Sequence, residues 1–174
     1  MNIKVQTAGF IPKGREFFIV HITKRKTLAI QNMDFDAVCL SVGQQKCDIA
    51  MAGLTVSEDR KEYVTFTDTY YQASQRLIVP SDNTKFDDMT DAESIAAALG
   101  ELDSSVKIGV QQGTTGQSYV QGSEDLGFPG LDATCQSYKS GSLAVQDMLH
   151  GNIDYVIIDA APAASITEAI NEMQ

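Results

Sequence analysis

The chain has 174 residues, of which 43% are hydrophobic, and its formal net charge is -10. A chain of this length can bury one core or two small lobes, and its composition excludes a disordered chain. The negative charge argues against nucleic acid as a partner, because phosphate backbones attract basic surfaces. The N-terminus lacks the apolar stretch of a signal peptide, and no apolar run is long enough to cross a membrane.

The start of the chain differs in charge from the rest. The first 26 residues hold six of the 13 basic side chains and one acidic residue, Glu16. This break marks residues 1–28 as atypical of the domain that follows. Within this segment, residues 4–6 and 17–22 predict strands, separated by a turn at residues 12–14.

The hydrophobic pattern becomes clearer from residue 28. The next predicted elements are a strand at 28–32, a helix at 34–44, a buried strand at 48–52, a helical turn at 55–60 and extended segments at 63–66 and 76–80. Cys39 lies on the apolar face of the predicted helix and is predicted to be a core thiol. Cys47 and Cys135 add no metal-ligand spacing, so no metal or cofactor is expected, and a Cys39–Cys47 disulfide stays open.

The second half of the chain alternates between helices and strands. The predicted order is helix 94–99, strand 107–110, helix to 121, strand 133–138, a helix capped by Ser140 or Ser142 and ended by Gly151, strand 155–158 and helix 163–173. This alternation predicts an α/β layer with a mostly parallel sheet, in which ligands bind beyond the carboxyl ends of the strands. Two features fall at those ends: the turn at 113–116 and Asp159.

Residues 52–60 form the first candidate site. Gly53 allows the backbone to approach a ligand, and Thr55 begins a helical turn whose free N–H groups attract an anion. Arg60 offers a planar fork that matches a carboxylate. The alternative is a capping box between Thr55 and Glu58, with Arg60 on the solvated surface, and the spacing alone favours this alternative.

Two further features complete a site for a ligand that carries a negative and a positive charge. The hydroxyls and N–H groups of Thr114 and Thr115 could receive an oxyanion, or these residues could simply cap a helix. Asp159 ends an apolar strand, where a buried carboxylate needs a cation such as a ligand ammonium, unless it is an N-cap. Together with Arg60 they predict a ligand that carries a carboxylate and an ammonium. No nucleophile–base pair accompanies them, so no catalytic residue is assigned.

Four segments carry a family resemblance. They are IQNMDFDA (30–37), CDIAMAGLTVSEDRKEYVTFTDTYY (47–71), VKIGVQQGTTGQSY (106–119) and GSLAVQDMLHGNIDYVIIDAAPA (141–163). In the same order, they resemble the polar amino-acid-binding proteins of ABC importers, which have a type II periplasmic binding protein fold. The resemblance implies two lobes that close on a ligand. Residues 1–77 would form a partial first lobe and hinge, 78–160 the second lobe and 161–174 a terminal helix.

The resemblance also implies a set of ligand-binding residues. They are Ala52, Gly53, Thr55, Arg60, Gln111, Thr114, Thr115 and Asp159. By motif position, the backbone at 52–53 would meet the amino group or the carboxylate. Thr55, Arg60 and Thr115 would hold the carboxylate, Asp159 would take the ammonium, and Gln111 would touch the ligand side chain.

The chain departs from the family at both ends. Residues 1–29 lack the family's opening strand, aromatic segment and helix, and the return from the second lobe to the first is absent. The resemblance therefore implies a periplasmic-binding-protein-like α/β fold with one nearly complete lobe and a partial first lobe. An incomplete lobe exposes apolar surface and invites self-association.

The implied function is binding of a free amino acid for import. Its partner would be an ABC importer permease, and its location periplasmic or extracellular and membrane-associated. Three alternatives stay open: a ligand-sensing receptor module of the same fold, a cyclohexadienyl-dehydratase-like enzyme, and a remnant that binds nothing.

Overall fold

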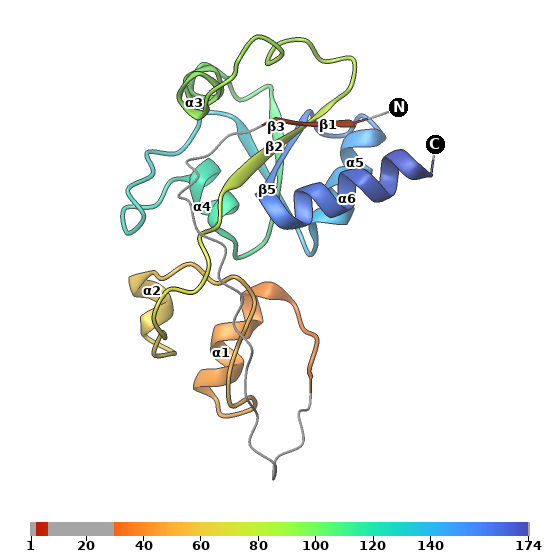
Figure 1. The fold of residues 1–174 in the computed structure, drawn as a ribbon. Helices are drawn as coiled ribbons and strands as arrows, with labels where there is room; N and C mark the ends of the chain where they lie inside the picture. Colours follow the sequence, from red (N-terminus) through yellow and green to blue (C-terminus); the bar gives the residue numbers. More distant parts are fainter. Residues whose placement is uncertain (1–2, 7–29, 174) are drawn as a thin grey trace.

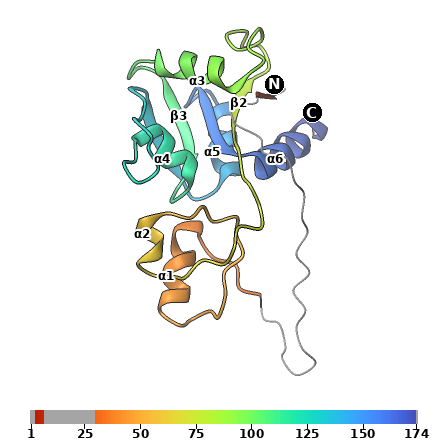
Figure 2. The ribbon, with the colours of Figure 1, turned by 60° about the vertical axis from the view of Figure 1, so that its left-hand side comes forward.

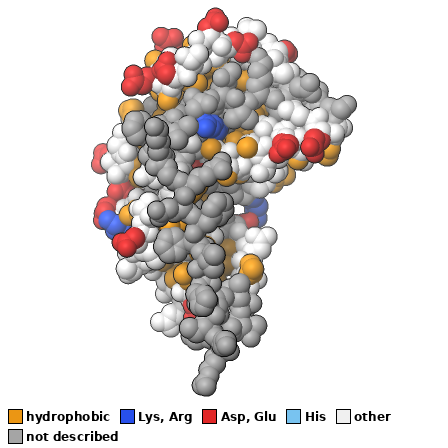
Figure 3. All heavy atoms as spheres, viewed as in Figure 1, with side chains coloured by type: hydrophobic (Ala, Val, Ile, Leu, Met, Phe, Trp, Pro, Cys, Tyr) orange, Lys and Arg blue, Asp and Glu red, His pale blue; other side chains and the backbone are white. Residues whose placement is uncertain are grey.

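The computed structural model describes residues 3–6 and 30–173, so the predictions for 12–14 and 17–22 lie outside the described residues. A larger lobe contains the sheet, and a smaller lobe built from residues 30–74 lies against one end of it (Figure 1). On the face shown in Figure 3, acidic side chains outnumber basic ones over the larger lobe, in keeping with the net charge.

The larger lobe contains one five-stranded sheet in the order β1-β2-β5-β3-β4. Its strands are β1 (Ile3–Gln6), β2 (Gln75–Pro80), β3 (Lys107–Gln111), β4 (Thr134–Tyr138) and β5 (Tyr155–Asp159). β3 pairs in parallel with β4 and β5, whereas β2 runs antiparallel to both β5 and β1. The predicted α/β fold with parallel strands after residue 100 is therefore confirmed.

Helices cover both faces of the sheet (Figures 1 and 2). α3 (Ala92–Gly100) and α4 (Thr115–Gln121) pack on one face, and α5 (Gly141–Leu149) and α6 (Ala160–Glu172) pack on the other. Successive residues of a strand point to opposite faces, so a strand buried on both faces is apolar throughout. In β2, Leu77 and Val79 join the core under α3 and α4, and Ile78 joins the core under α5 and α6.

Three helices of the larger lobe, α3, α4 and α5, begin at side chains that accept a hydrogen bond from the first turn. The Asp91 carboxylate accepts from Ser94 N at 2.8 Å, and the Thr114 hydroxyl accepts from Gln117 N at 3.4 Å. Ser140 accepts from Leu143 N at 3.3 Å, which resolves the choice between Ser140 and Ser142. Such caps satisfy N–H groups that the helix leaves free. Short polar side chains are preferred at these positions for that reason, so the sequence can predict them.

The smaller lobe has less regular structure than the sequence predicts. It contains a 3₁₀ turn at Phe35–Ala37, α1 (Val38–Gly43) and α2 (Glu58–Lys61). Cys39 is buried, which confirms the predicted core thiol, and all three cysteines are free thiols. The helical turn predicted at 55–60 begins later, because Ser57 rather than Thr55 caps it.

The strands predicted in the smaller lobe are not present among the described residues. Residues 48–52 form no ladder, and the side chains of Ile49 and Met51 are 63% and 56% exposed, so the prediction of a buried strand is wrong. Residues 30–32, the described part of the strand predicted at 28–32, are also unpaired, and the predicted extended segment 63–66 joins no sheet. An apolar segment becomes a strand only when a neighbour accepts its backbone hydrogen bonds, and the described part of this lobe offers no neighbour.

The position of β1 corrects one part of the expected lobe boundaries. Residues 3–6 were expected in the first lobe, but they pair with β2 at the edge of the larger lobe's sheet. The other boundaries stay predictions. None of the described helices has the length and apolar character needed to cross a membrane.

Candidate ligand-binding cleft

A hollow of about 300 Å³ lies between the two lobes. It is lined by Phe35, Ala52, Gly53 and Tyr71 from the first 74 residues, and by Gln111, Thr114, Ile158, Asp159, Ala161 and Pro162 from the larger lobe. The larger lobe's share lies at the carboxyl ends of β3 and β5, where parallel sheets place their ligands.

The structure brings all eight predicted site residues to this region in two groups. Ala52, Gly53, Gln111, Thr114 and Asp159 line the hollow itself. Thr55, Arg60 and Thr115 instead make hydrogen bonds that join the two lobes.

Arg60 joins the smaller lobe to the larger one. Its Nη1 donates to the carbonyl oxygen of Thr55 at 2.7 Å, and its Nη2 donates to the carbonyl oxygen of Gly113 at 2.8 Å. The guanidinium carbon also lies 5.7 Å from the centre of the Phe35 ring, a distance at which a cation is attracted to an aromatic face. Arg60 is half-buried, so the alternative of a solvated surface arginine is wrong.

The turn at 113–116 meets the smaller lobe closely. The hydroxyls of Thr115 and Thr55 lie 2.8 Å apart and share a hydrogen bond. Gly113 has φ +76°, and a Cβ there would lie 2.8 Å from Cβ of Asp36, so a glycine is required on both counts. Thr114 caps α4, and its hydroxyl donates to the carbonyl oxygen of Gln111 at 2.7 Å. Its side chain therefore acts as a helix cap, which was the alternative to an oxyanion site.

Asp159 does not act as an N-cap through its side chain, although it precedes α6. Its carboxylate accepts a hydrogen bond from Nε2 of Gln75, the residue opposite it in the register of β2 and β5. Burial raises the pKa of Asp159 above its ordinary value, and the Gln75 hydrogen bond and the charge of Arg60 lower it in part. A buried carboxylate of this kind gains from a cationic partner.

Sequence reasoning missed Gln75 and five lining residues. The lining residues are Phe35, Tyr71, Ile158, Ala161 and Pro162. The last three flank Asp159 in the chain, so their place in the cleft could have been inferred from that position. Gln75 carried no such signal, because it is 84 positions from Asp159 and only strand pairing brings the two together.

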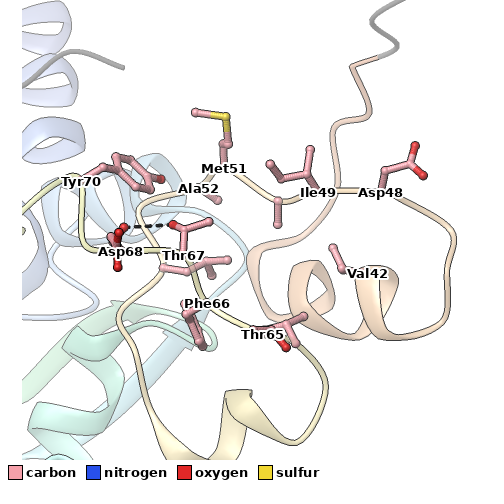
Figure 4. Close-up of a pocket in the computed structure, with 13 residues that line it drawn as sticks. Val42, Asp48, Ile49, Met51, Ala52, Thr65, Phe66, Thr67, Asp68 and Tyr70 are labelled. Carbon is pink, nitrogen blue, oxygen red and sulfur yellow. Dashed lines mark hydrogen bonds between the residues drawn. The ribbon is translucent and has the colours of Figure 1, made fainter. Parts of the chain in front are cut away.

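A second hollow, of about 360 Å³, lies within the smaller lobe (Figure 4). Its lining comes from α1 and from the unpaired segments 48–54 and 64–70. Most of these side chains are apolar, and Ala52 is the single predicted site residue among them. This hollow is larger than the cleft, but the cleft is lined by Asp159 and by Phe35, whose ring lies beside the Arg60 guanidinium. The cleft is therefore the candidate ligand site.

Comparison with known proteins identifies the family. Residues 19–173 match the profile of the bacterial extracellular solute-binding proteins, family 3. The chain belongs to this family. Among characterised relatives of this family 3 chain, the ABC transporter arginine-binding protein 1 of Escherichia coli K12 is 29% identical over 130 residues, which are 75% of this chain and 46% of that protein. The histidine-binding periplasmic protein of Salmonella typhimurium is 29% identical over 129 residues, 74% of this chain and 44% of that protein.

Solved structures of similar proteins show the same fold. An ancestral arginine-binding protein bound to arginine is 28% identical with a TM-score of 0.62, over 80% of this chain and 55% of that one. An ancestral amino acid-binding protein, a precursor of cyclohexadienyl dehydratase, is 27% identical with a TM-score of 0.63, over 79% of this chain and 55% of that one. The family 3 chain thus spans about half the length of the relatives it matches.

Proposed function

We propose that this family 3 chain binds a free amino acid in the cleft between its lobes. The observation that carries the proposal is the placement of opposite charges near one hollow. The half-buried Asp159 lines the hollow, and the guanidinium of Arg60 lies beside Phe35, another lining residue, where its charge acts on the Asp159 carboxylate. A zwitterion satisfies both charges at once. The names of the relatives, which bind arginine or histidine, support the same class of ligand.

Each predicted residue has a role in this proposal. A guanidinium has more N–H donors than the two that Arg60 gives to carbonyl oxygens, and its other donors would take the ligand carboxylate. The hydroxyls of Thr55 and Thr115 and the first turn of α4 at Thr114 would complete the anion site. Asp159 would take the ammonium.

The remaining residues would shape the pocket around the ligand. The backbone at Ala52 and Gly53 would approach the polar end of the amino acid. Gln111 would reach the ligand side chain, while Phe35 and Tyr71 would cover its apolar part. Gly53 has φ +63° and open space where a Cβ would stand, so it leaves the backbone accessible from the cleft.

Isothermal titration calorimetry with a panel of free amino acids tests the proposal. Arg60→Ala is expected to weaken binding at least about thirtyfold, because removing one partner of a buried charge pair costs about 2–5 kcal/mol. Lys61→Ala is the matched control, since Lys61 lies next to Arg60 on α2 but its ammonium pairs with exposed Glu58 at 2.5 Å. Equal affinities of the two variants would refute the role of Arg60.

We further propose that the chain works outside the cytoplasm. There it would deliver the bound amino acid to the permease of an ABC importer. The family description and the periplasmic relatives support this proposal. Reconstitution with a cognate permease should give ligand-dependent ATP hydrolysis. A receptor of the same fold would instead bind the ligand without stimulating any permease. A dehydratase-like enzyme would consume prephenate or arogenate in an absorbance assay, which the binding role does not predict.

We also propose that the smaller lobe pairs with a second copy of the chain. Its apolar hollow and the exposed side chains of Ile49 and Met51 support this, since apolar surface of this kind is usually covered. Native mass spectrometry should show a dimer that Met51→Lys weakens. Leu143→Lys is the control, because Leu143 is also exposed but lies on α5 of the larger lobe.

A further inference from the structure

A further hydrogen bond also joins the two lobes. The backbone N–H of Glu58, in the first turn of α2, donates to Oδ2 of Asp125 at 2.8 Å. The two residues are 67 positions apart in the chain. Asp125 belongs to the connection between α4 and β4 in the larger lobe, so its carboxylate reaches from one lobe to the helix that carries Arg60.

The connection that carries Asp125 is a closed turn. The backbone N–H of Ser123 donates to the carbonyl oxygen of Phe128 at 2.9 Å, and the N–H of Phe128 donates back to Ser123 at the same distance. Gly127, at φ +69°, closes the turn by donating to the carbonyl oxygen of Glu124 at 3.2 Å. The ring of Phe128 also meets Tyr119 of α4 edge-on at 5.4 Å. Asp125 is therefore presented on a turn anchored to α4.

The helix that donates to Asp125, α2, is a short element. It has four residues, and Ser57 caps it. Arg60 lies two positions after Glu58 and reaches the carbonyl oxygen of Gly113 with its Nη2. Asp125 and Gly113 therefore hold the same helical turn to the larger lobe at two points, one through the backbone and one through the Arg60 side chain.

We propose that Asp125 is a positioning residue for ligand binding, which holds α2 against the larger lobe so that the Arg60 guanidinium stays at the cleft. The inference rests on the proposed function, because it assigns Asp125 to the same ligand through Arg60. Asp125 touches no ligand in this scheme. Its carboxylate holds the N-terminal end of α2, and in its absence α2 keeps the hydrogen bond from the Arg60 guanidinium to Gly113.

This contact lies between the lobes. Its loss should therefore raise the dissociation rate of the ligand more than it lowers the association rate. Interactions that close a site after encounter act mainly on the dissociation rate. A hydrogen bond to a carboxylate at an exposed position supports an increase in the dissociation rate of roughly three- to tenfold. The association rate should change by less than about twofold.

The test compares Asp125→Ala with Asp125→Asn and with Glu124→Ala in the full chain. Asparagine keeps an oxygen that can accept from Glu58 N–H, so it should restore most of the affinity that alanine loses. Glu124→Ala removes a neighbouring carboxylate of the same turn and leaves the Asp125 contact in place. Stopped-flow measurements with arginine, histidine and glutamine as probes give the two rate constants for each variant.

Hydrogen exchange at the Glu58 amide provides a readout that needs no ligand. In Asp125→Ala this amide should exchange faster, while amides in the β3–β5 core keep their protection. If the wild-type chain binds none of the probes, the proposed function fails, and the exchange result alone decides the Asp125 contact. Unchanged exchange at Glu58, or faster exchange throughout the larger lobe, would overturn the proposal. An equal rise in dissociation rate for Glu124→Ala would overturn it as well.

Discussion

Replacing Asp159 by asparagine should separate the ligand-binding role of this residue from its cost to folding. Asparagine has nearly the same shape, and its Oδ1 can still accept from Nε2 of Gln75, so the side chain should keep its place. The negative charge is lost. If Asp159 pairs with the ligand ammonium, binding should weaken by about 2–5 kcal/mol, which is roughly thirtyfold to several thousandfold in Kd.

The same substitution should leave the fold intact and make it slightly more stable at neutral pH. Burial raises the pKa of Asp159, so the folded protein keeps a proton at pH values where the unfolded chain has lost it. Ionised Asp159 therefore costs stability, and that cost grows as the pH rises from the ordinary aspartate pKa through the raised one. Asp159→Asn should raise the free energy of unfolding near pH 7 and have no such effect in acid.

Calorimetric titration and urea unfolding over a pH series measure these two effects. In the wild type, ligand affinity should fall on acidification as Asp159 takes up a proton, with Arg60 and Gln75 as the groups that oppose this uptake. Asp132→Asn is the control, because Asp132 is exposed and precedes β4, at the end of the sheet away from the cleft. Unchanged affinity in Asp159→Asn, with the pH dependence retained, would refute the ammonium site.

Other substitutions test the contacts around the cleft and the core beneath it. Gly113→Ala should cost about 1–2 kcal/mol and weaken binding, since it strains φ +76° and forces a Cβ to 2.8 Å from Cβ of Asp36; an unaffected Kd would contradict this. Thr55→Val and Thr115→Val, combined in a double-mutant cycle of the free energy of urea unfolding, should show a coupling of about 0.5–1.5 kcal/mol, and strict additivity would argue against their shared hydrogen bond. Leu99→Ala should lower the free energy of urea unfolding by about 2–5 kcal/mol because Leu99 is fully buried, yet leave affinity unchanged under native conditions.

The elements of the larger lobe follow from local features of the sequence. The caps at Asp91, Thr114 and Ser140 lie where short polar side chains precede apolar helical patterns. The strands β3 and β5 are apolar runs, as expected for strands covered on both faces. Because these signals act over a few residues, the sequence alone predicts the α/β order and places Thr114 and Asp159 at strand ends.

The sequence could not predict how the smaller lobe would form. Residues 48–52 have the apolar character of a strand but remain unpaired in the structure. A strand depends on hydrogen bonds to a neighbour, and nothing in the composition of one segment says whether that neighbour is present.

Only the tertiary structure decided which side chains of the site meet. Gln75 reaches Asp159 because β2 and β5 pair in one register, and Arg60 reaches Gly113 because the smaller lobe lies at the carboxyl ends of the sheet. These partners are 84 and 53 positions apart. The residue types and motif positions of Arg60 and Asp159 identified them as charged site candidates. Long-range packing and strand register, which no local pattern encodes, then brought them to one cleft.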